Sequence, residues 1–149
     1  VAIAHERDER VKRLAGKIDR VLVDAPCSGL GTLRRNPDLK WRQSPQALEE
    51  LVAKQTAILE SAARLPKSGG RLVYATCSML PQENEAIAEA FTQAHRDFEP
   101  LDAGELLAQL KVPEAASLCS GGESGSRFVR LWPHRHQTDG FFAAVWQRK

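Results

Sequence analysis

Hydrophobic positions form short unbroken runs in some parts of the chain and helical repeats in others. Unbroken runs over residues 20–24 and 71–76 are typical of parallel strands that are buried on both faces. Between them, apolar residues recur at the spacing of one helix face after Ser44 and Pro45, a capping residue followed by a first-turn proline. The spacing predicts a helix of about five turns. It should end near residues 67–70, because the glycines there can adopt the left-handed conformation that ends helices.

The second half of the chain alternates between the same two patterns. Amphipathic repeats predict helices over residues 83–95 and 103–110 that pack on the sheet. Residues 119–126 are rich in glycine and serine, which is typical of a mobile loop. Strands are expected over residues 127–132 and 141–146, with an Asp-Gly turn just before the second.

The order strand, helix, strand, helix predicts one α/β domain over residues 1–149. Parallel strands should be joined by right-handed crossovers, and the last two strands should close the sheet as an antiparallel pair. Ligands of open sheets bind beyond the C-terminal ends of the strands. Residues 24–31 and 76–78 follow the two predicted parallel strands. We therefore expect Cys27 and Cys77, which lie in these two segments, to share one crevice.

Composition and charge restrict the classes of protein that fit. Hydrophobic residues make up 42% of the 149 and charged residues 27%, as in ordinary globular proteins. There is no basic-then-apolar leader and no apolar run of about 18 residues, so we expect no secretory signal, no membrane span and a cytoplasmic location. The 21 Lys and Arg against 19 Asp and Glu give a net charge of only +2. Any case for a nucleic-acid partner must therefore come from local clusters of basic residues.

The cysteines and histidines indicate neither a disulfide framework nor a metal site. Three cysteines at wide spacing do not form the pattern of a disulfide-bonded secreted domain, so reduced thiols are expected. No CxxC pair is present, and His134 and His136 have no acidic or thiol companions near them in sequence. We expect no metal, an exposed turn at these histidines, and an incidental role for Cys119.

Two short segments carry a specific resemblance. Residues 24–31, DAPCSGLG, and residues 75–78, ATCS, resemble the fourth and sixth motifs of the Nol/Nop/Sun family of RNA cytosine-5 methyltransferases. The resemblance runs from about residue 20 to the end of the chain and includes RRNPD at residues 34–38 and TDGFF at residues 138–142. It implies a partial Rossmann-like fold and S-adenosylmethionine as the cofactor. It also implies RNA, ribosomal RNA in particular, as the partner of a protein that we expect to be a monomer.

The resemblance assigns the chemistry to two thiols and one carboxylate. Cys77 is similar to the family's nucleophile, a thiolate that adds to carbon 6 of cytosine and so lets carbon 5 take a methyl group. Cys27 is similar to the loop cysteine implicated in release, and Asp24 to the carboxylate that holds the cytosine edge near the cofactor. Pro26 is expected to line the cofactor site beside Asp24. The alternative interpretations are a small buried residue for each cysteine and a loop cap for Asp24.

A basic cluster follows the first of these motifs. Arg34, Arg35, Lys40 and Arg42 lie close in sequence to the expected base pocket, together with Trp41. Such a cluster suits RNA phosphates and a stacked base. The alternative is a solvated loop with Trp41 packed into the core.

The sequence lacks the glycine-rich loop with which the family binds its cofactor. Residues 1–4 followed by residues 5–8 look like a middle strand with an acidic end, so the chain should begin midway through the catalytic domain. Asp8 is the candidate adenosine contact, and Glu6 is the alternative to it. Without the loop, the chain alone should show no measurable methyl transfer and at most weak cofactor affinity.

Two other functions remain open at this point. In a DNA cytosine-5 methyltransferase the nucleophile is the cysteine of a Pro-Cys motif, so Cys27 and Cys77 would exchange roles. The Thr-Cys-Ser strand end disfavours that assignment. An RNA-binding remnant or accessory domain would keep the basic cluster without catalysis.

Overall fold

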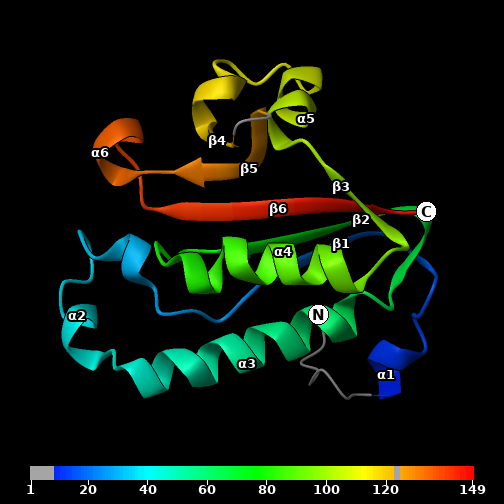
Figure 1. Cartoon of the computed structure of the whole chain (residues 1–149), viewed down its shortest axis with the longest axis horizontal. Coiled ribbons are helices and arrows are strands. Elements are labelled where there is room, and N and C mark those ends of the chain that lie inside the picture. Colours follow the sequence, from blue (N-terminus) through cyan, green and yellow to red (C-terminus); the bar gives the residue numbers. More distant parts are fainter. Residues whose placement is uncertain (1–8, 123–124) are drawn as a thin grey trace.

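The computed structural model describes residues 9–122 and 125–149 (Figure 1). The predicted strand at residues 1–4 and the candidate contacts Glu6 and Asp8 therefore lie outside the described residues. No helix in the described ranges is long and apolar enough to cross a membrane.

One mixed sheet runs through the molecule in the order β1-β2-β6-β5-β4, and β3 pairs with β6 beyond this path. Only β1 and β2 pair in parallel among the described strands; the remaining pairs are antiparallel. The expected α/β class, with a parallel pair followed by an antiparallel one, is confirmed. The bounds are β1 Ile18–Asp24, β2 Pro66–Thr76, β3 Phe98–Leu101, β4 Cys119–Gly122, β5 Gly125–Leu131 and β6 Phe141–Arg148.

The helices differ in length and in place. The longest, α3, packs against β1 and β2, whereas α5 packs against β5. Figure 1 shows α3 and α4 running along one side of the sheet, with α5 on the other side of β6. The bounds are α1 Glu9–Lys12, α2 Leu39–Arg42, α3 Pro45–Ala62, α4 Glu85–Ala94, α5 Ala103–Gln109 and α6 Pro133–His136. Single 3₁₀ turns occupy Leu30–Thr32, Pro81–Glu83 and Ala115–Leu118.

Helix α3 begins where the sequence predicts, but it ends before the predicted residues 67–70. The Ser44 hydroxyl accepts a hydrogen bond from the Ala47 amide at 3.1 Å, as a helix cap does. The helix ends at Ala62, so the prediction that Gly69 and Gly70 stop it is wrong. Both glycines lie in β2, next to an irregularity in its pairing with β1. Gly69 has φ +75°, the left-handed conformation that glycine adopts at low cost in such irregularities.

Two further predictions need correction. Strand β1 is less buried than its apolar run suggests: Val23 is 4% exposed but Leu22 is 68% exposed. The reason is that successive side chains point to opposite faces of the sheet: Val23 points into the core with Leu59, whereas Leu22 points to the other face, and β1 is also an edge strand in the described sheet. Residues 119–126 were expected to be a mobile loop, but β4 and the start of β5 pair there, with Cys119 opposite Val129. Glycine and serine have weak strand preferences, so their abundance did not predict these strands. The strands form because they pair with each other.

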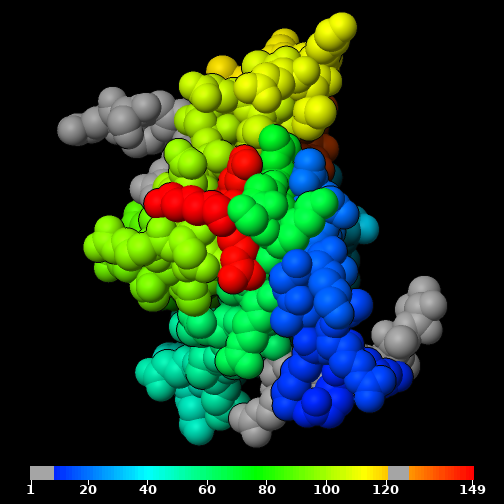
Figure 2. Space-filling model, turned by 90° about the vertical axis from the view of Figure 1, so that its right-hand side faces the viewer, coloured from blue at the N-terminus to red at the C-terminus, as the bar shows by residue number. Residues whose placement is uncertain are grey.

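Large aromatic side chains fill the core between the sheet and α4. Tyr74, Phe142 and Trp146 are almost completely buried. The rings of Phe91 and Trp146 meet edge to face with centroids 4.8 Å apart. At the end of the sheet away from the cysteines, the last residues of β6 lie beside the start of β2, which lies in turn beside the start of β1 (Figure 2). The Arg148 guanidinium donates there to the Pro66 carbonyl at 2.8 Å. Because β2 and β6 are paired and packed along their length, the C-terminal end of β2, which Cys77 follows, is held in place.

Candidate active site

The two cysteines lie in loops that leave β1 and β2 at the same edge of the sheet. Parallel pairing continues past the strands, because the Ala25 amide donates to the Ala75 carbonyl at 2.9 Å and the Gly31 amide to the Cys77 carbonyl at 2.8 Å. The Sγ atoms of Cys27 and Cys77 are 3.4 Å apart. Both thiols are free and partly exposed. The prediction that they share one crevice is confirmed.

The contact between the thiols changes their pKa values in opposite directions. A hydrogen bond from Cys27 stabilises the Cys77 thiolate and lowers the pKa of Cys77 to about 7. The same contact, followed by burial, raises the pKa of Cys27. The negative charge of Asp24 acts in the opposite direction on the pKa of Cys77, as does burial, but both effects are smaller than that of the hydrogen bond. Of the two protons, the one on Cys77 is therefore lost first, with its midpoint near neutral pH.

Asp24 and Pro26 lie beside this pair at the end of β1, and both are exposed. They contribute to a hollow of about 470 Å³ whose other walls include Val21, Val23 and Ile58. Consecutive residues of β1 line it, so it runs along the outer edge of that strand and not over one face of the sheet. Lys54 and Ser61 line it as well, so the hollow combines apolar walls with a few polar groups, as small-molecule sites do, and its carboxylate can accept from an amine or hydroxyl group.

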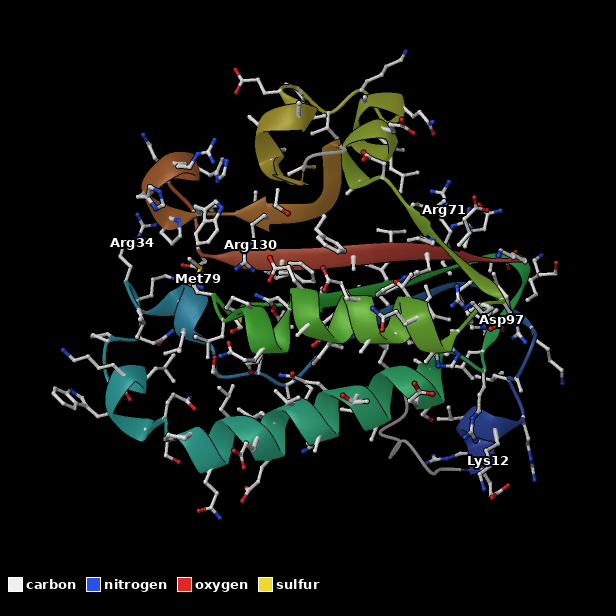
Figure 3. All side chains as sticks on the ribbon, viewed as in Figure 1. Lys12, Arg34, Arg71, Met79, Asp97 and Arg130 are labelled. Atoms are coloured by element: carbon white, nitrogen blue, oxygen red, sulfur yellow. The ribbon has the colours of Figure 1, made fainter. Side chains whose placement is uncertain are left out.

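Three segments converge on the backbone at the cysteine loops. The Gly140 amide donates to the Gly31 carbonyl at 2.8 Å. A Cβ atom on Gly31 would overlap the carbonyl oxygens of both Gly140 and Cys77, and one on Gly140 would overlap the Met79 side chain. The turn before β6 is thereby bound against the loop after β1, a contact that the sequence pattern did not predict. Figure 3 shows Met79 and Arg34 at this end of the molecule.

Glu83 is the buried group that the sequence analysis missed. Its carboxylate accepts hydrogen bonds from the Ser28 amide at 2.8 Å, the Ser28 hydroxyl at 2.6 Å and the Gln55 side chain at 2.9 Å. The Ser78 hydroxyl also donates to it. By sequence, Glu83 looked like an ordinary first residue of an amphipathic helix, where acidic side chains are favoured by the helix dipole. No local signal distinguishes it; its burial depends on the cysteine loops meeting above it.

The basic cluster is exposed, and its members differ in their partners. Arg35 forms a two-point ion pair with Asp139. Arg42 pairs with Asp38 at 2.7 Å. Arg34 and Lys40 are exposed, and no ion pair joins either to a described residue.

Trp41 does not pack into the core. It is 80% exposed, so that alternative is wrong. The Lys40 ammonium lies over its ring, 4.7 Å from the centroid. A flat aromatic face beside a cation is therefore open to solvent on this side of the crevice.

The expected exposed turn is found at His134 but not at His136, which is partly buried and bonded to the backbone. His136 Nδ1 accepts from the Trp132 amide at 2.8 Å, and its Nε2 lies 2.9 Å from the Ser117 carbonyl. Both ring nitrogens are thus engaged with the backbone, while His134 is exposed. Among the described residues no group of three potential ligands could hold a metal ion.

Comparison with known proteins places the chain in a family. Residues 2–147 match the family described as 16S rRNA methyltransferase RsmB/F. The chain belongs to this RsmB/F family. The resemblance of its two cysteine motifs to Nol/Nop/Sun methyltransferases is thereby confirmed.

Individual relatives agree with this membership. The chain is 46% identical over 129 residues to a probable ribosomal RNA small subunit methyltransferase B of Synechocystis, covering 85% of the chain and 26% of that protein. It is 48% identical over 128 residues to ribosomal RNA small subunit methyltransferase B of Escherichia coli, covering 86% of the chain and 26% of that protein. The chain therefore spans about a quarter of the length of these relatives.

A solved structure shares the RsmB/F fold. NSun6 from Pyrococcus horikoshii, determined with SFG, superposes with a TM-score of 0.72 at 26% identity. The match covers 99% of this chain and 34% of that one.

Proposed function

We propose that this chain carries the cysteine pair of a methyltransferase that transfers a methyl group from S-adenosylmethionine to carbon 5 of cytosine in ribosomal RNA. The observation that carries the proposal is the 3.4 Å contact between Cys27 and Cys77, with the pKa of Cys77 lowered to about 7. Membership of the RsmB/F family supports RNA methylation as the reaction.

Cys77 supplies the nucleophile. Its thiolate adds to carbon 6 of cytosine, and the electron pair displaced from the ring makes carbon 5 able to attack a methyl group. A pKa near 7 suits this step, because much of the thiol is ionised at neutral pH while the sulfur keeps most of its nucleophilicity. Partial exposure leaves the sulfur open to an incoming base.

Cys27 assists release. After methyl transfer, a water molecule takes the proton from carbon 5, and the electron pair of that C–H bond restores the double bond between carbons 5 and 6. The bond from carbon 6 to Cys77 breaks at the same time, and its electron pair returns to the sulfur. The Cys27 S–H, 3.4 Å away, donates to the departing thiolate and makes it a better leaving group. The same contact that lowers the pKa of Cys77 before attack therefore speeds its departure afterwards.

Asp24 and Pro26 are the described residues that would hold the cofactor. S-adenosylmethionine, when bound, supplies the electrophilic methyl group. The exposed Asp24 carboxylate can accept from an amine or hydroxyl group, and it lies close enough to Cys77 to act on its pKa. This proximity supports a role for Asp24 in orienting the cytosine edge between thiolate and cofactor. Asp8 stays a proposed adenosine contact outside the described residues.

RNA binding falls to the exposed segment after the first cysteine loop. Arg34 and Lys40 are free to meet phosphates, while Trp41 offers a face for base stacking. Arg35 and Arg42 can join them only by exchanging their present carboxylate partners.

The test is a methylation assay with the complete gene product, tritiated S-adenosylmethionine and unmodified small-subunit ribosomal RNA. We expect tritium in 5-methylcytosine, and none above background with Cys77→Ala. Cys119→Ala is the matched control, because that thiol lies in β4 away from the pair, and it should methylate as the unchanged protein does. Tritium in another nucleoside, or normal transfer by Cys77→Ala, would contradict the proposal.

A further inference from the structure

A carboxylate lies buried beneath the two cysteine loops and binds both. Glu83 is 0% exposed. Four donors surround it: the Ser28 amide, the Ser28 hydroxyl, the Ser78 hydroxyl and the Gln55 side chain. An ionised carboxylate is an acceptor with about four lone-pair positions, so the site satisfies it completely. A buried charge without such partners would be strongly destabilising.

The donors are placed symmetrically with respect to the thiols. Ser28 follows Cys27 and Ser78 follows Cys77, so each loop sends the residue after its cysteine down to the same carboxylate. The two serine hydroxyls are also 3.2 Å apart, which parallels the contact of the sulfurs above them. The paired serines therefore lie between the carboxylate and the paired thiols.

Glu83 is itself held firmly. Its backbone carbonyl accepts from the Tyr74 hydroxyl at 2.7 Å. The next residue, Asn84, donates to the Ser78 carbonyl at 3.0 Å and accepts from the Thr76 hydroxyl. The start of α4 is therefore bonded to β2 on both sides of Cys77.

We propose that Glu83 is a positioning residue that ties the two cysteine loops together and so sets the separation of the Cys27 and Cys77 sulfurs. An apolar side chain could fill the same space, but it could not bind Ser28 and Ser78 at once. Its relevance to methyl transfer rests on the function proposed above, whereas its effect on the thiols can be measured without RNA.

Two substitutions separate bonding from charge. In Glu83→Gln the amide oxygen can still accept from the Ser28 amide and Gln55, and the amide nitrogen can donate to the two serine hydroxyls after they turn. In Glu83→Ala all four contacts are lost. Glu89→Ala is the matched control, since Glu89 is exposed on α4 and its carboxylate does not touch the cysteine loops.

The readout is the affinity for phenylarsine oxide, which binds two neighbouring thiols with loss of water, measured together with the pH profile of Cys77 alkylation. Because small misplacements of reacting groups have large effects, we expect Glu83→Ala to weaken arsenical binding about tenfold or more. Its alkylation midpoint should rise as the Cys27 contact loosens. Glu83→Gln should stay within about threefold of the unchanged chain, and Glu89→Ala should match it.

Circular dichroism and thermal unfolding show whether Glu83→Ala folds, and so which variant is compared with the unchanged chain. If Glu83→Ala does not fold, Ser78→Ala takes its place, because it removes one loop's side-chain contact and leaves the carboxylate paired with Ser28. A folded Glu83→Ala, or failing that a folded Ser78→Ala, that keeps normal arsenical affinity and a normal alkylation profile would overturn the proposal. Thiol readouts that change as expected in a protein that never methylates RNA would contradict the proposed function and leave the positioning role standing.

Discussion

The cysteine crevice and the basic segment after it differ in nearly every physical respect, although they are adjacent in sequence. In the crevice, Ser28, Ser78 and Glu83 are buried and bonded to one another. In the basic segment, α2 is a single turn and Trp41 is 80% exposed. Bond-making chemistry benefits from groups fixed in advance, whereas binding a flexible polymer benefits from side chains that can adapt.

The energetics of the two regions differ accordingly. Exposed ion pairs such as that of Arg42 with Asp38 contribute about 0–1 kcal/mol. Backbone contacts at the crevice leave no room for an added methyl group, and overpacking of this kind costs about 1–3 kcal/mol. Substitutions should therefore act on stability and thiol chemistry in the crevice and on RNA affinity alone in the basic segment.

Gly31→Ala should have the largest effect. The new Cβ would overlap two carbonyl oxygens, so the loop must shift, at a loss of about 3 kcal/mol in the free energy of unfolding. Gly16→Ala is the control: Gly16 has φ +67° and nothing within 4 Å of an added Cβ, so only backbone strain of about 1 kcal/mol is expected. Denaturant unfolding measures both, and equal losses would show that the crevice is not tightly packed.

The pH dependence of Cys77 alkylation should change next most. Because its pKa is lowered, the thiolate is present above about pH 7, and the alkylation rate should reach half its maximum there. Cys27→Ala removes the donor, so the midpoint should move upward by at least about one pH unit and the rate at pH 7 should fall by at least about fivefold. Mass spectrometry of the Cys77 peptide follows the reaction. An unchanged midpoint would contradict the conclusion that a hydrogen bond from Cys27 lowers the pKa of Cys77.

Replacing Arg34 and Lys40 with alanine should have the smallest effect, confined to RNA binding. Each lost phosphate contact should reduce the slope of log affinity against log salt by about 1. Thermal stability and Cys77 alkylation should not change, because both side chains are exposed and the contact of Lys40 is with the equally exposed ring of Trp41. Arg96→Ala, at the opposite end of α4 from the cysteine loops, is the control. A slope that falls equally in the control would show that binding is not localised to this segment.

The sequence was informative where one local rule decides the outcome. Ser44 and Pro45 predicted the start of α3, and the position of Cys27 and Cys77 after two parallel strands predicted that they meet. The first inference depends on neighbouring residues alone, and the second on the general rule that loops after parallel strands meet at one edge of the sheet.

The failures share a different cause. Gly69 and Gly70 look alike in a helix stop and in an irregular strand, and only the pairing with β1 distinguishes the two. Glu83 is an ordinary acidic residue by sequence, and its role arises because three distant segments meet around it. Exposure of Trp41 likewise follows from the single-turn helix that carries it. No general rule of strand order predicts these particular contacts, and they leave no local pattern in one sequence.

The assignment of separate roles to the two thiols is tested most directly by trapping the covalent intermediate. The complete gene product is incubated with S-adenosylmethionine and unmodified ribosomal RNA and run on a denaturing gel. Cys27→Ala should accumulate a protein–RNA adduct, because Cys77 still attacks but leaves slowly without its donor. Cys77→Ala should form none. An adduct with Cys77→Ala and none with Cys27→Ala would contradict this account and assign the nucleophile to Cys27.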